Sequence, residues 1–131
     1  MSDPHPRQHS NIARNLLALF FLLIASWIVW LHLQKRALIN QENMAVQQID
    51  AGKPAAAVLI LLQLRQEFYK EKDIQRIDRY LADCYLQLAE NPENSTEVSL
   101  LYYRRLFRLD PTRVPESIRQ RLYRLDSGEE N

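Results

Sequence analysis

The hydrophobic residues of this chain form one unbroken run near the N-terminus and recur periodically after it. Residues 16–33 read LLALFFLLIASWIVWLHL and contain no aspartate, glutamate, lysine or arginine. A helical stretch of this length extends about 27 Å, close to the hydrocarbon thickness of a bilayer. The run is longer than the apolar core of a signal peptide, and no small-x-small cleavage site follows it. The pattern predicts an uncleaved transmembrane helix over residues 15–35, preceded by a polar leader of residues 1–14.

Charged and aromatic side chains frame this run, and we predict them to be membrane-interface anchors. They are Arg14 before the run, Lys35 and Arg36 after it, and Trp27 and Trp30 near its second end. Basic residues are nearly balanced on the two sides, so the positive-inside rule alone does not decide the orientation. The short leader and the tryptophans at the far end favour a cytoplasmic N-terminus. We expect a single-pass protein of a bacterial-type inner membrane, with its C-terminal domain in the periplasm.

His32 is the one titratable group inside the apolar run. Ionisable residues within membranes are costly and often functional, so one interpretation is a cofactor ligand or a member of a proton relay. The other is a neutral histidine at the interface, one helical turn from Lys35. Its place near the end of the run favours the second interpretation.

After this run, hydrophobic positions recur every three or four residues in several segments, which predicts amphipathic helices. The polar cluster Lys70 to Asp73 is expected to separate two of them. The predicted inward-facing stripes are Leu38, Met44, Ala45, Ile49 and Ala51; Ala57, Leu61, Leu64 and Phe68; Ile77, Leu81, Cys84, Tyr85 and Leu88; Leu100, Tyr103, Leu106 and Phe107; and Ile118, Leu122 and Leu125.

Capping signals divide these segments. Gly52 is a C-cap signal, and Lys53-Pro54 opens the next helix with proline in its first turn. Ser95 or Thr96 is a candidate N-cap. Asp110 precedes Pro111, which disfavours helical geometry in the residue before it. We predict an all-α fold: one transmembrane helix, two helical hairpins over residues 36–111, a capping helix over 112–126 and a tail of residues 127–131, about five helices in total.

Composition narrows the possible functions. Lysine plus arginine is 17 and aspartate plus glutamate is 16, a balance that argues against a nucleic-acid partner. Two glycines are too few for a glycine-rich phosphate loop. The single cysteine, Cys84, excludes an intrachain disulfide. The histidines, His5, His9 and His32, all precede the expected domain, so that domain has no Ser-His or Cys-His pair. We therefore expect no catalysis, no cofactor and no metal.

Residues 80–111 resemble a tetratricopeptide repeat. Leu81-Ala82 with Tyr85 matches the first-helix positions of such a repeat, and Ala89-Glu90 its turn. A longer loop at PENST and Leu106 in place of the usual alanine depart from the pattern. A weaker likeness around Gly52 and Ala57 extends the resemblance to residues 38–111. The second-helix matches are Ser99, Tyr103 and Leu106, and the ending is Leu109-Asp110-Pro111.

The resemblance implies a binding protein whose concave face is lined by first-helix residues. Its partner would be another membrane or periplasmic protein. Asp83 stands where carboxylate-clamp repeats carry asparagine, which argues against that clamp. The candidate partner-binding residues on this face are Glu42, Val46, Ile49, Asp50, Arg76, Arg79, Asp83 and Gln87.

Two functions stay open. The first is a membrane-anchored adaptor or assembly factor for protein–protein interaction. The second is a stoichiometric accessory subunit of a large respiratory, photosynthetic or secretion complex. The C-terminal arginines suggest a further surface, either for an acidic partner or headgroup, or as an ordinary solvated face. They are Arg104, Arg105, Arg108, Arg119, Arg121 and Arg124.

Overall fold

The computed structural model describes residues 7–68 and 70–126 of the chain. All regular structure in these two stretches is helical, which confirms the predicted all-α class. Parts of the leader and the whole tail of residues 127–131 lie outside the described residues. The chain divides into two compact units, residues 1–39 and residues 40–131, which we call unit 1 and unit 2.

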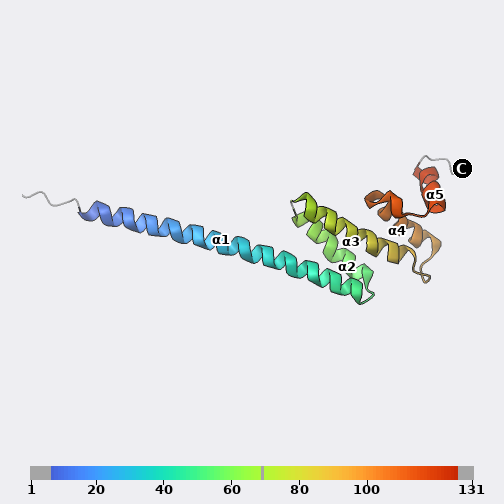
Figure 1. Ribbon diagram of the computed structural model, residues 1–131, viewed down its shortest axis with the longest axis horizontal. Coiled ribbons are helices and arrows are strands. Elements are labelled where there is room, and N and C mark those ends of the chain that lie inside the picture. The colour runs from blue at the N-terminus through green and yellow to red at the C-terminus, as the bar shows by residue number, and fades with distance from the viewer. Residues whose placement is uncertain (1–6, 69, 127–131) are drawn as a thin grey trace, which may run out of the picture. The chain divides into compact units, whose positions relative to one another are not determined.

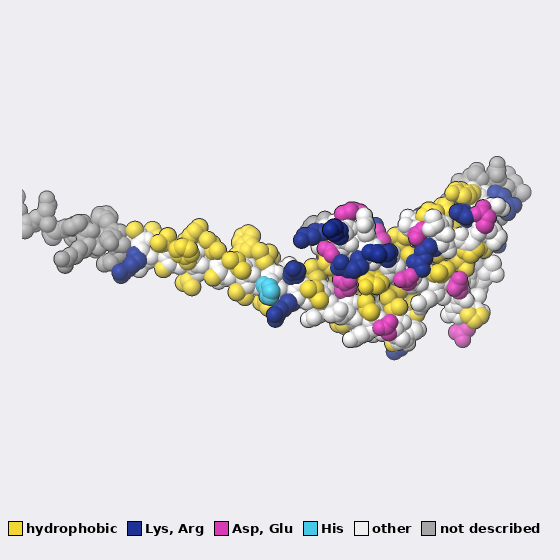
Figure 2. Space-filling model, in the orientation of Figure 1, with side chains coloured by type: hydrophobic (Ala, Val, Ile, Leu, Met, Phe, Trp, Pro, Cys, Tyr) yellow, Lys and Arg dark blue, Asp and Glu magenta, His cyan; other side chains and the backbone are white. Residues whose placement is uncertain are grey.

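Unit 1 contains most of helix α1, which spans Arg7–Asp50 (Figure 1). Among the described residues, α1 is the one helix long and apolar enough to cross a bilayer, as the sequence predicted. None of the side chains in its apolar stretch is buried. Phe21, Leu22 and Trp27 are each more than 60 % exposed. Figure 2 shows hydrophobic side chains along the visible face of this stretch.

Unit 2 contains the end of α1 and four further α-helices (Figure 1). Helix α2 packs on α3, α3 packs on α4, and α4 contacts both the short 3-10 helix η1 and α5. The helices of unit 2 are α2 (Pro54–Glu67), α3 (Glu71–Ala89), α4 (Thr96–Leu109), η1 (Pro111–Arg113) and α5 (Glu116–Asp126).

The first chain reversal in unit 2 depends on Gly52. Its φ of 70° lies in the left-handed region, which costs a residue with a β-carbon energy. The amide of Gly52 donates to the Ile49 carbonyl at 2.9 Å, and the amide of Lys53 donates to the Gln48 carbonyl at 2.9 Å. These two bonds form a Schellman motif, which satisfies the free carbonyls at the end of α1.

The other predicted helix ends are also present. Ser95 is the N-cap of α4, and its hydroxyl accepts from the Val98 amide at 3.4 Å. Asp110 leaves helical geometry with φ −149° and ψ 91°, directly before Pro111. Its carboxylate then accepts from the Thr112 amide at 3.1 Å. The carboxylate thereby starts the 3-10 turn that follows.

The core of unit 2 lies on both sides of α3. The predicted α3 stripe is confirmed, since all five residues are buried, and Tyr85 stacks on Tyr102 of α4. Leu106 from α4 is fully buried. The largest side chains that are under 2 % exposed are Leu61, Leu64, Ile77, Leu81, Leu106, Leu122 and Cys84.

Two local predictions were wrong. Helix α3 begins at Glu71, so part of the polar cluster forms its first turn, where Glu71 and Asp73 interact favourably with the helix dipole. At the end of α1, Ala45 is buried but Met44 is 54 % exposed, because the stripe is narrower than its spacing suggested. The predicted capping helix corresponds to α5, which begins at Glu116 after the separate 3-10 turn η1.

The buried position of Leu106 gives a stability prediction. We expect Leu106→Ala to lower the free energy of unfolding by about 2–5 kcal/mol, through lost burial and the cavity that remains. Leu101→Ala, a control on the same helix at a side chain that is 48 % exposed, should change it by less than about 0.5 kcal/mol. Chemical unfolding of the full chain in detergent, followed by circular dichroism, measures both. Equal stability of the two variants would contradict the packing of α4.

Candidate binding surface

Helix α3 positions most of the charged side chains that organise unit 2. Its apolar stripe faces the core, and the polar positions beside it reach three neighbouring elements. Arg76, Asp78 and Asp83 each make an ion pair with a different element. These pairs decide which of the predicted concave-face residues are available to a partner.

Arg76 pairs with Glu42 across two elements that the sequence leaves 34 residues apart. Arg76 Nε donates to Glu42 Oε1 at 2.6 Å, and Nη2 donates to Oε2 at 3.0 Å, a bidentate geometry. Arg76 Nη1 also lies 2.8 Å from Asp73 Oδ1. The hydrogen bond to Glu42 is the main reason that the pKa of Arg76 is raised above its ordinary value. Glu42 and Arg76, which were both predicted to bind a partner, are therefore engaged with each other within the domain.

Two further pairs connect α3 to its other neighbours. Arg65 of α2 makes a bidentate pair with Asp78, and the Nη2–Oδ2 distance is 3.2 Å. The hydrogen bond to Asp78 raises the pKa of Arg65. Arg113 of η1 donates from Nη2 to Asp83 Oδ1 at 2.6 Å. Asp83 is thus also engaged, by an arginine that the sequence analysis did not select.

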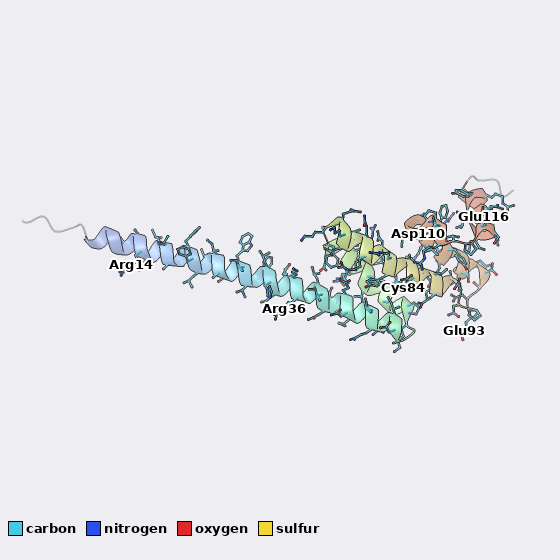
Figure 3. The ribbon with its side chains drawn as sticks, in the orientation of Figure 1. Arg14, Arg36, Cys84, Glu93, Asp110 and Glu116 are labelled. Atoms are coloured by element: carbon cyan, nitrogen blue, oxygen red, sulfur yellow. The ribbon has the colours of Figure 1, made fainter. Side chains whose placement is uncertain are left out.

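Arg79 differs from these residues. It is exposed, and among the residues that the structure describes no carboxylate lies within ion-pair distance of it. It borders a shallow cleft of about 460 Å³ between α3 and the end of α4. Figure 3 labels Asp110, at the α4 end of this cleft. The cleft is lined by Gln75, Asp78, Arg79, Ala82, Leu109 and Asp110.

The remaining predicted concave-face residues lie on α1 and α3. Val46 and Ile49 are half-buried at the end of α1, where Asp50 is exposed. Gln87 is exposed on α3. The structure brings Glu42 and Arg76 together. It places Arg79 at a cleft that is also lined by Leu109 and Asp110, which were not among the predicted binding residues. No local pattern marks that cleft, because its two sides come from helices joined by a loop.

The predicted membrane anchors all have exposed side chains on α1. Trp27 and Trp30 are 66 % and 55 % exposed. Figure 3 shows Arg14 and Arg36 on the two sides of the apolar stretch. His32 is exposed as well. Their role at an interface stays a prediction.

Cys84 does not contribute to this surface. It is fully buried in the core, and burial, with a smaller effect of the Asp83 charge, raises the pKa of its thiol to about 11. Thiols react as thiolates, so a buried thiol with this pKa is inert near neutral pH. Its side chain contributes packing volume.

The Glu42–Arg76 pair gives a second stability prediction. Glu42→Gln and Arg76→Gln should each destabilise unit 2, and the coupling free energy in a double-mutant cycle should be about 0.5–1.5 kcal/mol. Because the pair is partly buried and bidentate, we expect its coupling free energy to lie toward the upper end of the range for surface ion pairs. Gln63 and Glu67 provide the control cycle, because they are joined by one exposed hydrogen bond within α2. A coupling no larger than in this control would contradict the pair.

No protein-family model, curated protein or solved structure is significantly similar to this chain, so its function is argued from the geometry above.

Proposed function

We propose that this chain is a single-span membrane protein with unit 2 on the periplasmic side of a bacterial-type inner membrane. The observation that supports the span is the exposure of the α1 side chains. Leaving one leucine or phenylalanine side chain in water costs about 1.5–3 kcal/mol relative to burying it. An apolar run with no buried side chain therefore favours a lipid environment. Unit 2 has its own core and mixes charged with apolar side chains on the face that Figure 2 shows.

Unit 2 acts in this proposal as a non-catalytic, tetratricopeptide-like module that binds another membrane or periplasmic protein. Two observations support the likeness: α2 packs on α3 and α3 on α4, and the Glu42–Arg76 pair joins the two expected first helices. Arg79 supports the binding role, because it is an exposed cation beside a cleft. A segment with an acidic side chain would supply the countercharge. The chain is then an adaptor or assembly factor.

Membrane insertion has a direct test. We expect the chain to stay in the membrane fraction during alkaline extraction, because its anchoring is apolar. Replacing Leu23 and Ile28 by arginine should release it, since charges at the centre of a span cost about 2.5–3.5 kcal/mol each. Replacing the exposed residues Gln47 and Gln87 of unit 2 by arginine is the control. Protease added to intact spheroplasts should digest unit 2, and its protection there would reverse the proposed orientation.

The binding role has a separate test. We expect mild-detergent extraction of the tagged full chain to yield a complex with a defined second protein, identified by mass spectrometry. Arg79→Glu should weaken this complex about tenfold or more, because it places a like charge against the acidic partner. Lys72→Glu, at an exposed lysine in the first turn of α3, is the control. A large complex of fixed stoichiometry that survives both substitutions would instead indicate an accessory subunit.

A further inference from the structure

Helix α2 has a second apolar face opposite the one that it buries. Ala57, Val58, Leu61 and Leu64 are buried in unit 2. Leu59, by contrast, is 72 % exposed, the largest exposure of any large hydrophobic side chain among the described residues, and Leu62 is 38 % exposed. We define the α2 seam as Ala55, Leu59, Leu62 and Gln66.

The α2 seam has the spacing of a helix–helix contact. Its four residues are separated by four, three and four positions, the repeat that keeps one narrow stripe facing a partner helix in a two-stranded coiled coil. All four are exposed. The spacing therefore keeps the four side chains on one face of α2, where another helix can lie along them.

The charges around the seam indicate the chemistry of its partner. Helix α2 has no charged residue between Pro54 and Leu64. Arg65, the next residue, is paired with Asp78 of the same unit. An acidic or basic segment would find no countercharge on the seam and would lose its own hydration there. A second copy of α2 meets the seam with the same uncharged surface and the same length, so it brings no such penalty.

The size of the seam defines where such a contact is stable. Fourteen helical residues extend about 21 Å, and a helix face is about 10 Å wide, so two copies would bury roughly 400 Å² in total. Stable interfaces in solution bury about 1,200 Å² or more. Two copies held in one bilayer face a smaller entropic cost, because anchoring raises their effective concentration. This step rests on the proposed membrane anchoring.

We propose that the α2 seam is the contact through which two copies of this chain form a dimer in the membrane. Lipid and a different protein are the other occupants that an exposed apolar helix face admits. Each of these gives a different result in the experiment below.

The test uses a cysteine at the seam in the full chain. Leu59→Cys is reconstituted as the sole protein in neutral phosphatidylcholine vesicles and treated with a mild oxidant. Leu59 lies beside the midpoint of the seam, so its cysteine approaches the second copy in either direction of packing. Leu101→Cys, at another exposed leucine, is the matched control, and the unaltered chain controls for the buried Cys84. We expect about tenfold more disulfide-linked dimer at position 59 than at position 101.

A second variant tests whether the seam itself makes the contact. Leu62→Cys should also form the linked dimer, and adding Leu59→Lys should abolish it, because the lysine places two like charges in an uncharged contact. Adding Leu101→Lys should leave it unchanged. Both lysines replace exposed side chains, and circular dichroism verifies that the helices persist.

Three results would overturn the inference. Equal linkage at positions 59 and 101 would show random collision. Quenching of a fluorophore at position 59 by spin-labelled lipid, without linkage, would show that lipid covers the seam. Linkage at position 59 in native membranes only, to a product of a different mass, would assign the seam to another protein. Vesicle flotation distinguishes a failure of the dimer from a failure of the membrane anchoring. A chain that floats with the vesicles but forms no disulfide-linked dimer refutes the dimer alone. A chain that does not float with the vesicles refutes both the dimer and the anchoring.

Discussion

The burial of one face of α3 between α2 and α4 is the interaction on which unit 2 depends. The stripe from Ile77 to Leu88 is removed from water by two neighbouring helices at once. Each large aliphatic side chain buried in this way stabilises the fold by about 1.5–3 kcal/mol. Without α3, neither α2 nor α4 would retain the helix that covers most of its buried face. The same packing holds α4 in place, and α4 in turn contacts η1 and α5.

The polar edge of α3 has a complementary role. Three ion pairs from α3 reach α1, α2 and η1, so these three elements each have an electrostatic contact with α3. Partly exposed pairs of this kind contribute less energy than the core does. The same pairs engage Glu42, Arg76 and Asp83 within the domain, so a ligand would have to compete with an existing ion pair at each of them. Arg79 therefore carries the proposed binding role.

The sequence predicted most of what depends on local pattern. The α3 stripe was predictable because burial on one side of a helix imposes a period of three to four residues. The ends at Gly52 and Asp110 were predictable because few residues tolerate those backbone conformations. Met44 was misassigned, because a loose stripe does not show which side of a helix has a partner.

Other features were not accessible from the sequence. The Glu42–Arg76 pair joins residues 34 positions apart, and its existence depends on how α1 and α3 meet. The α2 seam could not be predicted because α2 is apolar on nearly all sides. The periodicity of its sequence therefore does not distinguish the buried face from the exposed one. The cleft at Arg79 needs two helices in their folded positions. The tetratricopeptide-like arrangement itself stays a proposal.

The packing of α2 on α3, of α3 on α4 and of α4 on α5 also bears on how the domain folds. Contacts between consecutive helices join residues close in the chain, and domains rich in such contacts fold in microseconds to milliseconds. Helices α2 and α3 can associate before α4 has been synthesised, and α5 can add last. This order of contacts suits vectorial folding, in which each helix packs on the one before it as the chain emerges from the N-terminal side.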